Sequence, residues 1–240
     1  DYMTSAHYGA AVPDANMDFA GTVTTSANAC DALISDGLTK RFVLGGRIEK
    51  RPVSENIELI RQCAQIMRPV YNNGLYQLNM DLAQSDSGVV LSEATNISSS
   101  GPMMVKGSAQ VYDRVVVKYV DVATNYKDNS VNSQAAATVT DPNYVEKRFD
   151  ILLITTGDQA TRIADYIQKR SQKDKSGTLR VMAEGTRVLP GTRLTVTWTP
   201  WGWTTPHDCI VTNCKPVGSY WDISVEEYDA TIYSDTVVSV

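Results

Sequence analysis

The clearest periodic pattern of hydrophobic and polar positions lies between residues 51 and 68. Apolar side chains recur every three or four positions on one half of a helical wheel, and charged or amide side chains occupy the other half. Ser54 is a suitable N-cap, and Pro69 ends the pattern. The sequence therefore predicts an amphipathic helix over 54–68 whose inward face includes Ile57, Ile60 and Ala64.

A second helix is predicted over 156–175. Thr156 and Gln159 have the spacing of a capping box, and apolar residues follow at helical intervals. The basic residues of 169–175 complement the dipole at the C-terminal end of this helix. This role at the helix end accounts for the basic cluster, so the cluster is not evidence of nucleic-acid binding. A weaker helical pattern, rich in Thr and Ser, covers 13–33.

The other hydrophobic segments are short, rich in β-branched or aromatic residues, and bounded by turn residues. They predict strands at 40–49, 70–71, 75–80, 111–122, 147–155, 178–185, 193–198, 208–214 and 220–228. The polar stretch 124–142 is expected to be a long surface loop. The fold class predicted is α+β, with a mixed α/β lobe over 1–110 and a β-rich, barrel-like lobe with one or two packed helices over 111–240.

Composition narrows the possible functions. The 240 residues are 42% hydrophobic and 20% charged, with a net charge of −5. A protein that grips nucleic acid needs a concentrated basic face, so specific nucleic-acid binding is not expected. No apolar run is long enough to span a membrane. The sequence starts at Asp1 without an initiator Met, which indicates a cut inside a longer chain. The four cysteines are expected to be reduced thiols of a protein made in a cytosol.

No catalytic, metal or cofactor site is predicted. The H-x-C-x4-C spacing of His207, Cys209 and Cys214 is not a standard zinc pattern, and the two cysteines have opposite parity in a predicted strand. Phosphate-binding and nucleophile motifs are absent from the sequence. The carboxylates of 222–229 could contain a catalytic pair, although solvated side chains on a strand are far commoner. We expect the protein not to be an enzyme.

Trp198, Trp201 and Trp203 form the one candidate interaction surface. Clustered indoles on a loop can stack against a sugar or anchor a protein interface. Because large aromatic residues are mostly buried, a structural role in the core of the lobe is favoured.

The order of motifs resembles a known family. The strand V-K-Y-V-D at 117–121 is followed by T-T-G-D-Q-A-T-R-I-A at 155–164, by V-L-P-G-T-R-L-T-V at 188–196 and by V-E-E-Y-D-A-T-I-Y at 225–233. The N-terminal half adds R-F-V-L-G-G at 41–46 and V-Y-N-N-G-L-Y at 70–76. This ordered set resembles the central hub region of phage tail-tip proteins, including the tip-attachment (host-specificity) proteins of lambda-like phages. The turn at 190–192 is Pro-Gly-Thr, whereas the family often has Pro-Gly-Asp.

The resemblance implies a mechanical role in the virion. Baseplate hub proteins of this kind form homotrimers about the tail axis, close the distal end of the tail tube, contact other tail-tip and tail-tube proteins, and organise host attachment and DNA delivery. The host receptor would be met by a region outside this chain. Two alternatives remain: a carbohydrate-binding module that uses the tryptophan cluster, and an interaction domain of a bacterial surface protein.

Overall fold

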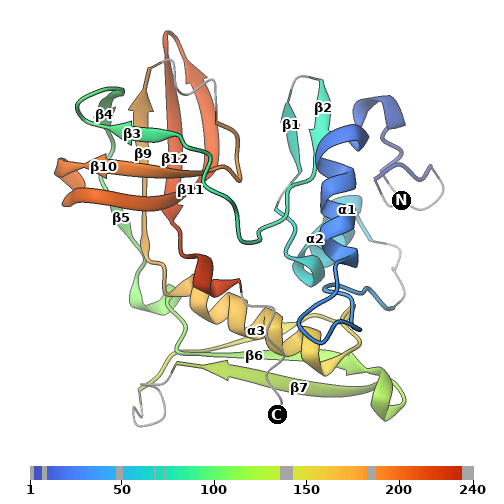
Figure 1. Cartoon of the computed structure of the whole chain (residues 1–240). Coiled ribbons are helices and arrows are strands. Elements are labelled where there is room, and N and C mark those ends of the chain that lie inside the picture. Colours follow the sequence, from blue (N-terminus) through green and yellow to red (C-terminus); the bar gives the residue numbers. More distant parts are fainter. Residues whose placement is uncertain are drawn as a thin grey trace. The chain divides into compact units, whose positions relative to one another are not determined.

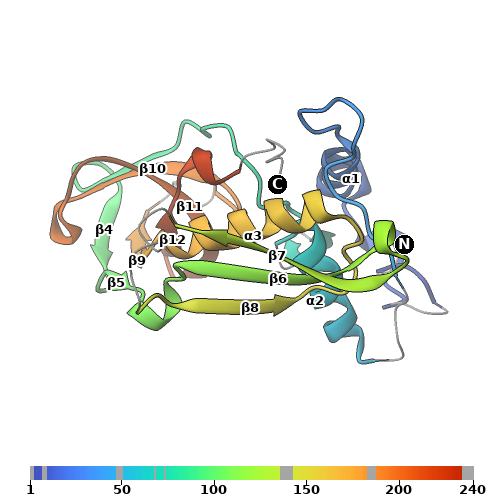
Figure 2. The ribbon, with the colours of Figure 1, turned by 90° about the horizontal axis from the view of Figure 1, so that it is seen from below.

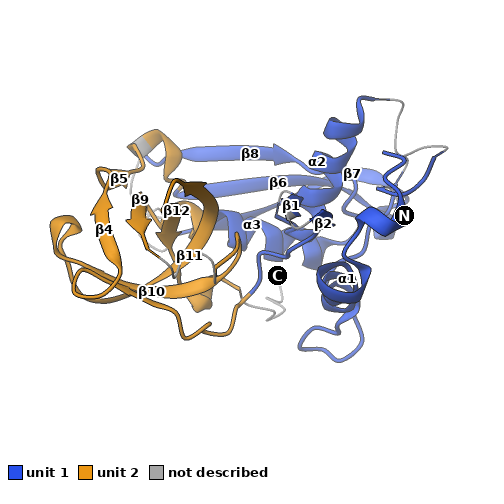
Figure 3. Cartoon of the chain, turned by 90° about the horizontal axis from the view of Figure 1, so that it is seen from above, with its two compact units in different colours: residues 1–82, 113–168, 234–240 blue, residues 83–112, 169–233 orange. Residues whose placement is uncertain are grey.

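The computed structural model describes residues 3–6, 10–46, 51–67, 69–72, 74–135, 143–182 and 188–233. The chain forms two compact units that are interleaved in sequence (Figure 3). Unit 1 combines the residues up to Leu82 with Asp113–Gln168, and unit 2 combines Ala83–Tyr112 with Lys169–Tyr233. These bounds differ from the two lobes, 1–110 and 111–240, that the sequence predicts. Asp113–Gln168 groups with the N-terminal residues and not with the later strands.

The first part of unit 1 is mostly helical. Its elements are the 3-10 turn η1 (Asp14–Asn16), the π-helical turn η2 (Phe19–Val23), α1 (Thr24–Asp31), α2 (Val53–Ala64) and the hairpin strands β1 (Val70–Asn72) and β2 (Leu75–Gln77). The helix expected over 13–33 is thus divided into three pieces. Residues 40–46 do not form the expected strand over 40–49; Lys40 makes an isolated bridge to Leu33. Residues 47–49 lie outside the described residues.

Helix α2 confirms the clearest sequence pattern but is shorter than predicted. Pro52 and not Ser54 occupies the N-cap, and the helix ends at Ala64, followed by the C-cap residue Gln65, whose backbone is left-handed with φ +51°. Ala64 is buried as expected, whereas Ile57 and Ile60 are half-buried. The inward face of the helix is therefore only partly covered.

The second part of unit 1 is a three-stranded sheet with a helix on one face. In the order β7–β6–β8, strand β6 (Arg114–Asp121) is antiparallel to β7 (Lys127–Gln134) and parallel to β8 (Glu146–Asp150). Side chains alternate along β6, so Val115, Val117 and Tyr119 are buried. Helix α3 (Gly157–Ser171) runs along the sheet (Figure 2). The 3-10 turn η4 (Val122–Thr124) joins β6 to β7.

Strand β7 corrects the expected loop at 124–142. Its sequence, K-D-N-S-V-N-S-Q, has a single large apolar residue and therefore no readable alternation. All eight of its residues pair with β6 in continuous register. An edge strand that is mostly exposed needs no apolar face, because main-chain pairing with its neighbour holds it in place.

Unit 2 is built on one seven-stranded sheet (Figure 1). Its order is β3–β10–β11–β12–β9–β4, and β5 also pairs with β9. The strands are β3 (Val90–Ser92), β4 (Ile97–Ser100), β5 (Met104–Val105), β9 (Lys175–Val181), β10 (Arg193–Trp198), β11 (Trp203–Val217) and β12 (Tyr220–Glu227). Short 3-10 turns are η3 (Ser108–Gln110), η7 (Thr199–Trp201) and η8 (Ala230–Ile232).

The two end strands of this sheet, β3 and β4, are consecutive in sequence. Asn96 makes the turn between them: its amide nitrogen donates to the carbonyl of Val90 at 2.9 Å, and its side-chain oxygen accepts from the Ser92 N–H at 2.8 Å. Among the described residues no ladder joins β3 to β4, so the expected barrel-like lobe is an open sheet and not a closed barrel. The α+β class itself is confirmed. No helix in the described part of the chain has the length and apolar character needed to cross a membrane.

Candidate interaction surfaces

The three tryptophans lie in the core of unit 2. Their exposed fractions are 7% for Trp198, 6% for Trp201 and 3% for Trp203, and all three belong to the main hydrophobic cluster of the sheet. Two indole N–H groups are satisfied internally: Trp198 donates to the Ser100 hydroxyl at 2.8 Å, and Trp201 donates to the Gly101 carbonyl at 3.0 Å. Buried rings cannot form a sugar platform or a protein anchor. The three residues thus have the core positions that the sequence favoured over an interaction surface.

His207, Cys209 and Cys214 also have structural positions. The His207 ring stacks on Trp203, with centroids 5.0 Å apart. Cys209 is fully buried in the core cluster and Cys214 packs against the same cluster, so the two cysteines do not face opposite sides of the sheet. The reason is a β-bulge between Val211 and Asn213, which changes the alternation of β11. Within the described residues, no group of three or more His, Cys, Asp or Glu side chains is placed to hold a metal ion.

Three of the acidic residues near the C-terminus, Asp222, Glu226 and Asp229, are paired with a cation. Asp222 accepts two hydrogen bonds from Arg180 at 2.8 and 2.9 Å, and this contact lowers the pKa of the carboxyl. Glu226 pairs with Arg170 at 2.9 Å. Asp229 pairs with Lys173 at 2.7 Å, and the hydrogen bond from this lysine, with those from Thr231, lowers the pKa of Asp229 to about 2. These carboxylates are parts of separate ion pairs.

The face of the unit 1 sheet that does not carry α3 is polar and open. Arg114, Lys118, Glu146 and Arg148 border a groove of about 640 Å³ over this face. Arg114 and Lys118 alternate with the buried positions of β6. Glu146 accepts from Arg148 at 2.9 Å and lies 3.5 Å from Arg114. The hydrogen bond from Lys118 to Asp128, together with the charge of that carboxylate, raises the pKa of Lys118. Opposite charges on neighbouring strands thus form a ladder across an exposed face.

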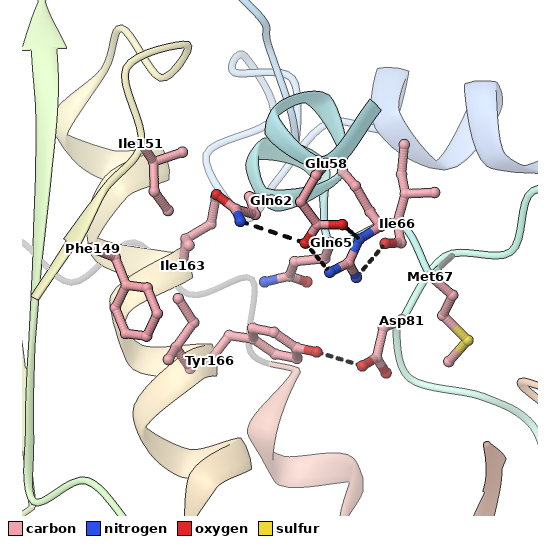
Figure 4. A pocket seen from close by; sticks show the side chains of 12 residues that line it. Glu58, Gln62, Gln65, Ile66, Met67, Asp81, Phe149, Ile151, Ile163 and Tyr166 are labelled. Carbon is pink, nitrogen blue, oxygen red and sulfur yellow. Dashed lines mark hydrogen bonds and ion pairs between the residues drawn. The ribbon is translucent and has the colours of Figure 1, made fainter. Parts of the chain in front are cut away.

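A second pocket, of about 350 Å³, lies in unit 1 between the end of α2, the segment around Asp81, strand β8 and helix α3 (Figure 4). We call it the α2–α3 pocket. Its apolar side chains are mainly on α3 and the β8 end, and its polar side chains are mainly on α2 and at position 81. The lining residues are Glu58, Arg61, Gln62, Gln65, Ile66, Met67, Asp81, Phe149, Ile151, Ile163, Tyr166 and Ile167.

The polar side of the α2–α3 pocket is held by a defined set of bonds. The Arg61 guanidinium donates to both oxygens of Glu58 and, at 3.2 Å, to the carbonyl of Ile66. The hydrogen bond to Glu58, with the charge of that carboxylate, raises the pKa of Arg61. The hydroxyl of Tyr166 donates to the Asp81 carboxylate. The left-handed Gln65 lets its carbonyl accept from the Asp81 N–H at 2.8 Å, which fixes the acid at the pocket wall.

An apolar cavity of about 160 Å³ lies on the other side of α2. Ile57 and Ile60 line it together with Met17, Phe19 and other apolar residues of unit 1. This cavity explains why both isoleucines are only half-buried. Sequence reasoning identified neither of these pockets nor the polar sheet face. The alternation of Arg114, Val116 and Lys118 with buried valines was a readable signal for the face, whereas both pockets depend on contacts between distant segments.

Comparison with known proteins identifies relatives among phage tail proteins. A family model described as "Putative phage tail protein" matches residues 77–207, which is more than half of the chain. The match begins at the end of β2 and includes the three-stranded sheet, α3, β9 and β10. No curated protein sequence matches the chain.

Solved structures share the fold. A chain in the virion of a native gene transfer agent particle superposes with a TM-score of 0.64 at 9% identity, covering 90% of this chain and 49% of that one. The 43 kDa tail protein of prophage MuSo2 from Shewanella oneidensis gives a TM-score of 0.50 at 12% identity, covering 79% of this chain and 57% of that protein. At these identities the likeness shows the fold. The chain spans about half the length of the chains it matches.

Proposed function

The chain belongs to the phage tail protein family, and from this membership we propose that it is a hub component of the tail tip. In this role it closes the distal end of the tail tube and organises host attachment and DNA delivery. The observation that carries the proposal is the family match over residues 77–207. The resemblance of the ordered motifs at 117–121, 155–164, 188–196 and 225–233 to tail-tip hub proteins supports the tip-hub part of the proposal.

The exposed surfaces favour a role that works through interfaces. The polar face of the β7–β6–β8 sheet has two cross-strand ion pairs, Arg114 with Glu146 and Lys118 with Asp128, and one pair within β8, Arg148 with Glu146. Such a face discourages non-specific hydrophobic association, and charge complementarity on it can select a partner and fix its register. We infer contacts with other tail-tip and tail-tube proteins, and a homotrimer about the tail axis. Contact with the host receptor is assigned to a region outside this chain.

The proposed role is mechanical and does not include catalysis. A carbohydrate-binding module is not proposed, because the tryptophans that motivated it are buried. The protein acts in the virion after synthesis in the bacterial cytoplasm.

Immunogold labelling of intact particles tests the proposed position of this chain at the tail tip. An antibody raised against this chain, with a gold-labelled secondary antibody, should mark the end of the tail distal to the capsid in electron micrographs. Particles assembled without the gene are the control and should show no label. Label along the tail tube, or at the junction of tail and capsid, would refute the tip assignment.

A further inference from the structure

The apolar cavity beside α2 is open to solvent and has room for one aromatic ring. Its lining includes Met17, Phe19, Ile57 and Ile60, and Phe19 is 43% exposed. Its volume is about 160 Å³. An apolar protein cavity of about 150 Å³ holds one benzene molecule. Methionine sulfur and aromatic side chains both make favourable contacts with an aromatic ring, so a ring suits this lining better than an aliphatic side chain.

The turn between β6 and β7 presents such a ring at one end of the three-stranded sheet (Figure 2). Tyr126 is 69% exposed, and its ring has no aromatic contact within the described residues. Val122 in the same turn is 45% exposed. Tyrosine is among the side chains that most often anchor protein interfaces. The turn therefore has the character of an anchor for a partner with an apolar cavity.

The backbone of this turn has a conformation that tyrosine rarely adopts. Asn125 and Tyr126 are both left-handed, with φ +59° and +60°. Asparagine tolerates this region, whereas a bulky side chain there is strained. Asp121 holds the turn, because its side chain accepts from the Ala123 N–H at 2.9 Å and its carbonyl accepts from the Tyr126 N–H at 2.8 Å. A strained residue with an exposed ring is better explained by a contact outside the chain than by stability of the chain alone.

The charges beside the ring and beside the cavity are complementary. Lys127 follows the tyrosine directly, is exposed, and has no ion pair in the described part of the chain. Asp14 and Asp18 belong to the segment that supplies two of the lining side chains, and neither carboxylate has an ion pair with another described residue. The cation in the lining, Arg61, is already paired with Glu58. A lysine that arrives with the ring therefore meets acidic side chains at the cavity.

We propose that the cavity beside α2 in one copy of this chain receives Tyr126 from the turn of a second copy. The contact brings Lys127 towards Asp14 and Asp18 of the receiving copy. Because the two surfaces differ, each copy can give its ring to one neighbour and receive a ring from another. Head-to-tail contacts of this kind close into a ring when the rotation between copies allows it. The number of copies in that ring rests on the proposed function, but the contact itself does not.

Methyl NMR of the full chain tests the contact. The labelled protein is Tyr126→Asn, which keeps the cavity but cannot dock into another copy, and asparagine preserves the left-handed turn. Its isoleucine methyl groups are labelled, and the unlabelled, unmodified chain is added up to about 1 mM, where even a weak single contact is populated. We expect the resonances of Ile57 and Ile60 to shift. Unlabelled Tyr126→Asn should bind at least about tenfold more weakly, because the anchoring ring is gone.

Two further unlabelled variants separate the ring from charge and from general hydrophobicity. Lys127→Gln should weaken docking by less than about fivefold, since an exposed ion pair contributes little. Leu38→Asn is the matched control, because Leu38 is an 86% exposed apolar side chain of the same unit, and this variant should dock like the unmodified chain. The urea midpoint of Tyr126→Asn should equal or exceed that of the unmodified chain, because asparagine relieves the backbone strain.

Several results would overturn the proposal. They are equal shifts of Ile57 and Ile60 with the unmodified chain and with Tyr126→Asn, no shift at about 1 mM, or shifts confined to other isoleucines. Loss of docking in Leu38→Asn would also overturn it, as would a urea midpoint of Tyr126→Asn below that of the unmodified chain, which would give the ring a structural role. Failure here leaves the tail-tip position untouched, and gold label away from the tip leaves this contact between copies untouched.

Discussion

Replacing Gly177 by alanine should destabilise unit 2, because the core has no room for one more carbon atom. Gly177 lies in β9, and a Cβ at this position would lie 2.5 Å from two ring atoms of Trp201. The indole cannot move away freely. Its N–H donates to the Gly101 carbonyl at 3.0 Å, and its ring packs edge-on against Trp203 with centroids 5.2 Å apart.

The size of the effect follows from two opposing terms. Overpacking a close-packed core costs about 1–3 kcal/mol. Replacing glycine by alanine also reduces the entropy of the unfolded chain, which stabilises by about 0.4–1 kcal/mol where the backbone is compatible. We expect a net loss of about 1–2 kcal/mol in the free energy of unfolding. Gly107→Ala is the matched control, because a Cβ there meets nothing within 4 Å and its backbone is not left-handed. It should be neutral or slightly stabilising.

Urea titration followed by tryptophan fluorescence measures the unfolding midpoint of both variants. The fluorescence is sensitive to the change because Trp201 is the ring that the new Cβ displaces. Gly177→Ala should lower the midpoint and shift the emission of the folded state, while Gly107→Ala should do neither. The double variant Gly177→Ala with Trp201→Phe should lose less stability than the sum of the two single changes, because the smaller ring relieves the clash. Equal midpoints for Gly177→Ala and Gly107→Ala would refute the reasoning.

Two further predictions concern unit 1 and the pH dependence of stability. Ile60→Ala should cost about 1–2 kcal/mol, less than the 2–5 kcal/mol typical of a fully buried site, because Ile60 is half-buried beside a cavity; a loss above about 3 kcal/mol in urea titration would contradict this. The pKa of Asp229 is lowered from 3.8 to about 2 by Lys173 and Thr231, so its contribution to stability is complete above about pH 4 and is lost as the pH falls towards 2. Asp229→Asn should remove at most about 1 kcal/mol above pH 4, since the pair is partly exposed, and most of this difference in thermal stability from the unmodified chain should be lost by pH 2. A difference that persists unchanged at pH 2 would contradict the assignment.

Elements with a strong amphipathic pattern could be predicted from the sequence. Helix α3 was expected over 156–175 and is Gly157–Ser171, and β10 is Arg193–Trp198 as expected. In both, the buried residues recur at the period of the element, so local sequence and tertiary packing agree. Strand β7 could not be predicted, because its stability comes from backbone pairing with β6 and its side chains are mostly exposed.

Other features of the structure depend on contacts between segments that are distant in sequence and could not be predicted. The return of Asp113–Gln168 to unit 1 has no local signal. The bulge in β11 reversed the expected side of Cys214 with respect to Cys209. For the tryptophan cluster the sequence favoured a place in the core but not the contacts there: the turn η7 folds it inward, where Ser100 and Gly101 accept the hydrogen bonds of two indoles. The α2–α3 pocket likewise brings together residues 58–67, Asp81 and 149–167.

The central claim is that this chain is a trimeric hub of a phage tail tip. The net charge of −5 opposes self-association only weakly at physiological salt, where the Debye length is about 8 Å, so assembly is expected to rest on apolar and backbone contacts with several neighbours. Cryo-electron microscopy of intact particles, reconstructed at the tail tip without imposed symmetry, tests the claim most directly. The account predicts three copies of this fold arranged about the tail axis at the distal end of the tube. A twofold or sixfold arrangement of the fold, or its absence from the tip, would contradict it.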